Sequence, residues 1–222
     1  YDLDGDLDMY MMNHSVHSNN TFDNAEIRRN SHPLAGDKLL RNDDGKFADV
    51  TEESGIYNSA LGYGLGIGIS DFNRDGYPDI YIGNDFHEDD YLYINNGDGT
   101  FTESLAEMMP HTSRSSMGNE LVDINNDGLT DIFSLDMLPS DYEMLKASAA
   151  EDPIRIYQTK LKYGYKHQFS RNTLQLNRGN GKFSDIGLLA DVYATNWSWA
   201  TLAADFNHNG YVDLFVTNGI RG

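Results

Sequence analysis

The sequence predicts an all-β protein built from repeated four-stranded antiparallel units. Two short patterns that alternate along the chain carry this prediction: an acidic nine-residue loop of the form D-x-N-x-D-G-x-x-D, and a tight Asn/Asp/Gly turn followed by Phe. Segments rich in β-branched and aromatic residues flank both patterns, as strands do. The 222 residues suffice for one sizeable core or two small ones.

The composition is strongly acidic. Asp and Glu number 35 against 16 Lys and Arg, which gives a formal net charge of -19. Nucleic acids and anionic membranes require basic patches, so neither is an expected partner. The chain has no apolar run long enough for a transmembrane helix, and its lack of cysteine excludes disulfides and thiolate metal sites. The excess of acid therefore calls for a local explanation.

The acidic loop supplies that explanation. Complete copies occupy residues 71–79, 123–131 and 205–213, with Asn209 in place of the third acid in the last copy. Residues 1–8 show the same pattern without its first residue. We therefore expect the given chain to begin inside a loop and to be a piece of a longer protein.

The spacing of this loop matches calcium chemistry. Ca²⁺ takes six to eight oxygen ligands, and positions 1, 3 and 5 of a tight loop supply side-chain oxygens, position 7 a carbonyl and position 9 a closing carboxylate. Glycine at position 6 permits the sharp turn. A metal-free Asx-rich turn is the alternative, but recurrence of the same spacing favours calcium. We expect up to four Ca²⁺ sites, the first truncated and the last weaker. The predicted ligands are Asp2, Asp4, Asp6 and Asp8; Asp71, Asn73, Asp75, Tyr77 and Asp79; Asp123, Asn125, Asp127, Leu129 and Asp131; and Asp205, Asn207, Asn209, Tyr211 and Asp213.

An EF-hand begins with the same loop pattern but is excluded here. It requires a bidentate Glu at position 12 and helices on both sides. Position 12 is Ile82, Ser134 or Val216, and the flanking residues are typical of strands. The loops are therefore predicted to join strands.

The tight turns complete a repeating unit. Residues 40–47, 94–101 and 176–183 each read as a hairpin whose second strand opens at Phe. The distance from each hairpin to the next acidic loop is nearly constant, whereas the distance from loop to hairpin varies. Each unit thus has strand A, acidic loop, strand B, variable connection, strand C, tight turn and strand D, which predicts β-propeller blades. We interpret residues 1–222 as one domain, a partial propeller of about three and a half blades.

Two long insertions interrupt the variable connections. Residues 14–37 are polar, and residues 139–168 are predicted to be partly helical. Ser140 and Glu143 form a potential capping box for a first helix, and Ile154–Tyr163 is a potential second helix. In an up-and-down blade the acidic loops and tight turns share one rim and the variable connections share the other. We expect recognition on this variable rim.

Three polar clusters leave alternatives open. The basic stretch 155–171 is either a set of solvated helix faces or a docking surface. The acidic run Asp85–Asp90 is a solvated turn, a second cation site or a sugar-binding edge. His14 and His17 are surface histidines or a transition-metal pair.

No catalytic motif stands out. The sequence contains neither G-x-S-x-G nor H-E-x-x-H. Trp197 and Trp199 alternate along a predicted strand, so they face opposite sides, and we expect one of them to pack between blades.

The motifs resemble the FG-GAP/VCBS repeats of integrin-α-like calcium-binding β-propellers. Residues 171–177 (R-N-T-L-Q-L-N), 196–200 (N-W-S-W-A) and 216–219 (V-T-N-G) further resemble bacterial secreted or outer-membrane VCBS-repeat proteins that carry ASPIC/UnbV domains. The resemblance implies a seven-bladed propeller, of which this chain is a part. It also implies an exported protein that is extracellular, on the cell surface or associated with the outer membrane.

The function expected on this basis is non-enzymatic. Structural Ca²⁺ supports a propeller that recognises a protein or glycan in adhesion. One alternative is an accessory surface-lipoprotein subunit of an outer-membrane nutrient-uptake complex. The other is a calcium-dependent polysaccharide lyase, with a base from the stretch 155–171.

Overall fold

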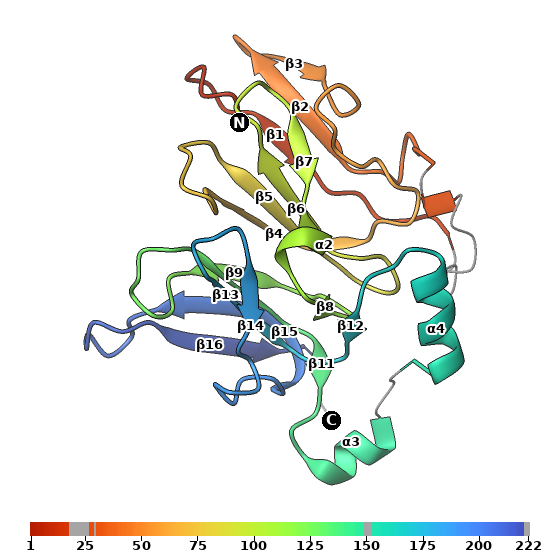
Figure 1. The fold of residues 1–222 in the computed structure, drawn as a ribbon, viewed down its shortest axis with the longest axis vertical. Coiled ribbons are helices and arrows are strands. Elements are labelled where there is room, and N and C mark those ends of the chain that lie inside the picture. Colours follow the sequence, from red (N-terminus) through yellow and green to blue (C-terminus); the bar gives the residue numbers. More distant parts are fainter. Residues whose placement is uncertain (18–26, 29, 149–151, 220–222) are drawn as a thin grey trace.

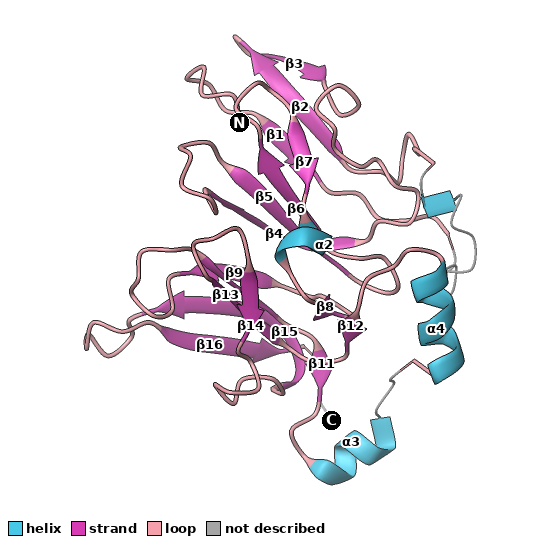
Figure 2. Cartoon of the chain, in the orientation of Figure 1, coloured by secondary structure: helices cyan, strands magenta, loops and turns pink. Residues whose placement is uncertain are grey.

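The protein is mostly antiparallel β-structure with a few short helices (Figures 1 and 2). The computed structural model describes residues 1–17, 27–28, 30–148 and 152–219, so parts of both predicted insertions lie outside the described residues. No described helix has both the length and the apolar character needed to cross a membrane.

Four antiparallel sheets are present in the described parts of the chain, and their strands follow in chain order except for β11, which precedes β13 but pairs in the last sheet. Two of those described have four strands in the predicted A-B-C-D order, and the first and last have three. The sheets comprise β1 (Met9–Met11), β2 (Lys38–Asp43) and β3 (Lys46–Asp49); β4 (Gly64–Ser70), β5 (Asp79–Asn84), β6 (Tyr91–Asn95) and β7 (Phe101–Glu103); β9 (Asn119–Val122), β10 (Asp131–Ser134), β13 (Thr173–Asn177) and β14 (Phe183–Asp185); and β11 (Met137–Leu138), β15 (Asn196–Ala204) and β16 (Asp213–Asn218). A short parallel pair joins β8 (Thr112–Ser113) to β12 (Gln168–Phe169). Within the described residues these sheets do not close into a ring.

The core lies between successive sheets. Every residue of β5 is buried, and its side chains alternate between two hydrophobic clusters. Ile80 and Ile82 share a cluster with Leu39 of the first sheet, whereas Tyr81 shares one with Ile132 of the third. Strand β5 is therefore apolar on both faces because both of its faces are covered by neighbouring sheets.

The strands that precede the acidic loops approach each other closely. A β-carbon on Gly68 of β4 would stand 2.7 Å from the side chain of Leu121 on β9, and one on Gly66 would stand 2.5 Å from Asn119. Any larger residue would push these two strands apart. The alternating glycines of β4 thus set the spacing between the second and third sheets.

The helices whose bounds the structure describes are α2 (Leu105–Met108), α3 (Tyr142–Ser148) and α4 (Ile154–Lys162). The predicted second helix of the 139–168 insertion is confirmed as α4, and Gly164 follows it with a φ of +85°. The predicted capping box is wrong. Asp141 directly precedes α3, and its Oδ1 accepts a 2.9 Å hydrogen bond from the Met144 amide, whereas Ser140 donates its own amide to Asn196.

Neither tryptophan is fully buried, whereas the sequence predicts that one of them packs between blades. Trp197 is half-buried and pairs with Met137 of β11, whereas Trp199 is 53% exposed. Both lie on β15, in the last described sheet. An irregularity between Ser198 and Ala200 also interrupts the strand alternation.

Candidate metal-binding loops and a cavity on the opposite rim

The acidic loops share one backbone shape. Positions 4 and 6 have positive φ in every copy, for example +61° at Arg74 and +93° at Gly76. The loops join β4 to β5, β9 to β10 and β15 to β16 along one edge of the molecule (Figure 1). The tight turns lie against them: a β-carbon on Gly97 would stand 2.9 Å from the ring of Tyr77. Loops and turns therefore share a rim, as predicted.

Predicted ligands at positions 1, 3 and 5 converge in the second loop. The Asp71 carboxylate accepts hydrogen bonds from the amides of Asp75 (3.1 Å) and Gly76 (2.8 Å). Asn73 Oδ1 accepts from the Asp75 amide at 3.0 Å, and Asp75 Oδ1 accepts from the Tyr77 amide at 2.9 Å. These bonds hold the three side chains turned into their own loop.

The third loop repeats this geometry. Asp123 accepts from the amides of Asp127 (3.0 Å) and Gly128 (2.8 Å), and Asn125 Oδ1 accepts from Asp127 at 3.1 Å. Asp127 in turn accepts from the Leu129 amide at 2.8 Å. Two independent stretches of sequence thus form the same oxygen-lined loop.

The closing carboxylates at position 9 of the second and third loops are fully buried. Asp79 accepts from the amides of Phe72 and Asn95, both at 2.8 Å. Asp131 accepts from Ile124 at 3.0 Å and Asn177 at 2.8 Å. These two residues therefore fasten each loop to strand C of its own sheet.

The first and last loops differ from this pattern. In residues 205–213, Asp205 again accepts from the amides at positions 5 and 6, but the Asn207 side chain donates to Asp213 at 3.2 Å. In residues 1–8, Asp2 and Asp4 accept from amides two residues later, and the Asp6 carboxylate accepts from Asp44 at 3.2 Å.

The donor set of the two regular loops fits a hard cation. Within the parts of the chain that the structure describes, no group of three His, Asp or Glu side chains is arranged to hold a metal by itself. Calcium coordination here would also need the amide oxygens of Asn73 and Asn125 and the main-chain carbonyls of Tyr77 and Leu129. Oxygen donors of this mixed kind are those that Ca²⁺ accepts.

Neighbouring loops are linked through position 4, which the sequence reading passed over. The Arg74 guanidinium donates to the Gly128 carbonyl of the next loop. The Asn126 side chain likewise donates to the Gly210 carbonyl of the loop after that, at 2.9 Å. Each loop thus supports its neighbour along the rim.

An asparagine at the end of strand C ties three elements together. The backbone amide of Asn177 donates to Asp131. Its side-chain nitrogen donates to the carbonyl of Phe72 in the preceding loop at 2.9 Å, and its Oδ1 accepts from the backbone amide of Gly179 in the tight turn at 3.0 Å. Asn95 makes the equivalent bonds in the second sheet. Recurrence of Asn immediately before each tight turn was the available sequence signal.

A recurrent hydrogen bond between a side chain and the backbone closes each B–C connection. The residue just before strand C accepts the backbone amide at the end of strand B: Asp37 from Asn13 (2.9 Å), Asp90 from Asn84 (2.8 Å) and Asn172 from Asp136 (2.7 Å). A tyrosine hydroxyl also donates to the first two, from Tyr10 at 3.0 Å and from Tyr81 at 2.6 Å.

The third sheet lacks both the tyrosine hydroxyl and the carboxylate of this arrangement. The residue equivalent to Tyr81 is Phe133, and the residue equivalent to Asp90 is Asn172, so neither the hydroxyl nor the charge is present. A buried carboxylate without a donor is unfavourable. The two changes therefore belong together.

The acidic run Asp85–Asp90 is not a solvated turn, so that one of its three predicted roles is wrong. His87, Glu88, Asp89 and Asp90 are each 7% exposed or less. Arg28 of the first insertion pairs with Glu88 and Asp89, so charge pairing makes the burial possible.

The basic stretch 155–171 is only partly a surface feature. Lys160 is buried and hydrogen-bonds Gln168, and Arg171 pairs with Asp185 at 2.7 Å. Arg155, Lys162 and Lys166 are exposed. Fewer of its basic side chains therefore contribute to a positive surface patch than the sequence alone indicates.

His14 and His17 do not form a metal pair in the described structure. His14 stacks on Tyr63 with ring centroids 4.1 Å apart, and its Nε2 lies 3.2 Å from the Gly64 carbonyl. His17 instead faces His32 edge-on.

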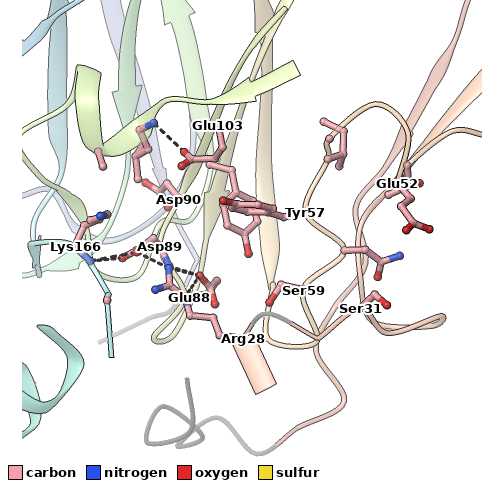
Figure 3. A pocket seen from close by; sticks show the side chains of 18 of the residues that line it. Arg28, Ser31, Glu52, Tyr57, Ser59, Glu88, Asp89, Asp90, Glu103 and Lys166 are labelled. Atoms are coloured by element: carbon pink, nitrogen blue, oxygen red, sulfur yellow. Dashed lines mark hydrogen bonds and ion pairs between the residues drawn. The ribbon is translucent and has the colours of Figure 1, made fainter. Parts of the chain in front are cut away.

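A cavity of about 1300 Å³ opens on the rim that carries the insertions (Figure 3). Its walls come from the first insertion (Arg28, Ser31), the segment after β3, the acidic run and the chain following α4 (Tyr163, Lys166). The variable rim therefore contains a large polar recess.

Burial raises the pKa of several carboxyl groups near this rim. The pKa of Asp37 is raised to about 6, and those of Glu88 and Asp90 to about 7. In each case the removal of water from the charged form is the largest cause. Hydrogen bonds from Tyr10, Tyr81 and Arg28 oppose this effect only in part.

Acidification should therefore stabilise the calcium-free protein. Between the raised pKa near 7 and the ordinary value near 4, the folded state keeps protons that the unfolded chain releases, so the free energy of unfolding increases as pH falls from 8 to about 5. We expect a gain of about 1 kcal/mol or more per pH unit below pH 7. Thermal melts in chelator across this range measure it, and a Tm that falls steadily from pH 8 downward contradicts the prediction.

Comparison with known proteins gives one family. The FG-GAP-like repeat matches residues 71–134 and 165–216, which together make up more than half of the chain. These ranges include the two regular loops and the β13–β14 hairpin. No match to a curated protein is found.

Proposed function

Since this chain belongs to the FG-GAP-like repeat family, we propose that it is a calcium-stabilised, non-enzymatic part of a β-propeller that recognises a protein or glycan outside the cell. FG-GAP repeats are found in β-propeller proteins of the surface and adhesion type, and their fold is typically non-enzymatic. The four successive sheets would be blades. The insertions and the cavity would form the recognition rim.

The observation that carries this proposal is the repeated loop geometry. Loops 71–79 and 123–131 turn the same oxygen donors inward through equivalent hydrogen bonds, on the rim opposite the cavity. Bound Ca²⁺ would supply a positive charge between these carboxylates and so offset their mutual repulsion. Calcium then acts as a structural element, and the other rim is free to bind a partner.

Calorimetric titration with Ca²⁺ tests the proposal. We expect binding at both regular loops with Kd on the order of 10⁻⁴–10⁻³ M, as in extracellular modules, and weaker binding at 205–213. Asn209→Asp restores the missing carboxylate and should tighten that last site. Absence of heat at millimolar Ca²⁺, or no effect of Asn209→Asp on the weakest site, would contradict it.

The two alternatives remain predictions. A lyase needs a base beside the cation. The exposed basic residues Arg155 and Lys162 belong to α4, which Figure 1 shows on the side of the molecule away from the acidic loops, and Lys166 follows this helix. Membership of an outer-membrane complex would be tested by co-purification.

A further inference from the structure

The cavity on the insertion rim is strongly acidic. Of the described residues that line it, seven are acidic and two are basic. The acidic ones are Asp49, Glu52, Glu53, Glu88, Asp89, Asp90 and Glu103. Arg28 is already engaged: it pairs with Glu88 and Asp89, and its guanidinium lies 4.1 Å from the centre of the Tyr165 ring. The remaining field therefore repels anions and attracts cations.

Two buried polar atoms of the cavity lining have no hydrogen-bond partner among the residues that the structure describes. They are Glu88 Oε2 and the Tyr91 hydroxyl, and both residues are only 3% exposed. Figure 3 shows Glu88 between Arg28 and the side of the cavity that bears Tyr57 and Ser59. A buried carboxylate oxygen without a donor is unfavourable by about 1–3 kcal/mol, and more when charged. A donor from a bound molecule would remove this penalty.

We propose that this cavity binds a basic segment of a partner protein, with a Lys or Arg side chain donating to Glu88 Oε2 and the Tyr91 hydroxyl. The inference rests on the proposed recognition function and names its ligand class. A uronate or sulfated glycan is disfavoured by the acidic lining. A cationic nitrogen carries the donors that both unpartnered atoms lack.

Size and aromatic surface favour a peptide over a free amine. The volume of about 1300 Å³ exceeds the roughly 300–1,000 Å³ typical of small-molecule pockets. Tyr57, which is 51% exposed, and Tyr163, which is 36% exposed, both line the cavity. Aromatic rings pack well against the aliphatic stems and charged ends of Lys and Arg.

Fluorescence anisotropy with a labelled Lys/Gly peptide, in saturating Ca²⁺, tests the proposal. Glu52→Gln removes one exposed charge of the cavity and should weaken binding by up to about fivefold. Glu88→Gln removes the buried charge and replaces one carboxylate oxygen by an NH2 donor, so it should weaken binding by about 30-fold or more. The matched control is Glu143→Gln on α3, which makes the same charge change outside the cavity and should leave Kd unchanged. Circular dichroism checks that each variant is folded.

The outcomes separate this inference from the proposed function. Binding that is lost equally in Glu52→Gln and Glu143→Gln, or that persists with a Glu/Gly peptide, overturns the inference. The inference is also overturned if the protein binds a neutral glycan and not the Lys peptide, and if Glu52→Gln leaves that glycan binding unchanged. If calcium binds normally but the Lys peptide does not, only the inference fails. If the peptide binds and calcium does not, the calcium-dependent function fails instead.

Discussion

Calcium should raise the melting temperature of this protein by about 10 °C or more. With Kd near 10⁻³ M or below, about 10 mM Ca²⁺ adds roughly 1.4–2.7 kcal/mol per occupied loop, and a domain of this size gains about 2–4 °C per kcal/mol. This free energy already includes the relief of repulsion among the carboxylates of a chain whose formal charge is -19. Differential scanning calorimetry with Ca²⁺ and then with chelator measures the effect.

Two controls make this result specific. Mg²⁺ at the same concentration screens charge equally but binds such flexible oxygen loops poorly, so it should give a much smaller shift. Asp127→Asn removes one ligand charge of the third loop and should reduce the calcium-induced shift. Asp98→Asn makes the same change at an exposed residue of a tight turn and should not. An equal melting temperature in chelator and in Ca²⁺ would contradict the prediction that calcium stabilises the protein.

Tyr81→Phe should destabilise the protein by about 1–3 kcal/mol, because it removes a hydrogen bond to a buried carboxylate. The Tyr81 hydroxyl donates to Asp90 at 2.6 Å, and both residues are at most 1% exposed. The double variant Tyr81→Phe/Asp90→Asn should recover much of this loss, since it reproduces the Phe133 and Asn172 pair of the third sheet. In the double variant, the hydroxyl of Ser116, which lies 3.0 Å from Asp90 Oδ2, would be close enough to accept from the new amide.

Chemical denaturation of the four members of this mutant cycle, at fixed Ca²⁺, gives the coupling energy. Tyr93→Phe is the matched control: its hydroxyl accepts from the Tyr57 amide at 3.1 Å and, among the described residues, makes no hydrogen bond to a carboxylate, so its loss should be about 0.5–1.5 kcal/mol. Additive effects of the two substitutions at 81 and 90 would mean that the pair is not coupled.

Local patterns predicted much of the molecule. The A-B-C-D strand order, the tight turns and helix α4 follow from turn chemistry and hydrophobic alternation, which act between residues close in sequence. The same reasoning misplaced the acidic run Asp85–Asp90. Charged side chains next to one another normally remain in water. Their burial depends on partners distant in the sequence, among them Arg28, about sixty residues away, which pairs with Glu88 and Asp89.

The sequence by itself determined the repeated unit and the residues that line its acidic loops, since a loop of nine residues contains its own donors, glycine and turn. Only the tertiary structure decided how the units join: Asn177 reaching the preceding loop, Arg74 reaching the next one, and glycines at 66 and 68 letting strands meet. It also decided that two insertions and one acidic run surround a single cavity. Contacts between residues distant along the chain leave no periodic trace in the sequence, because they depend on where the sheets place each side chain.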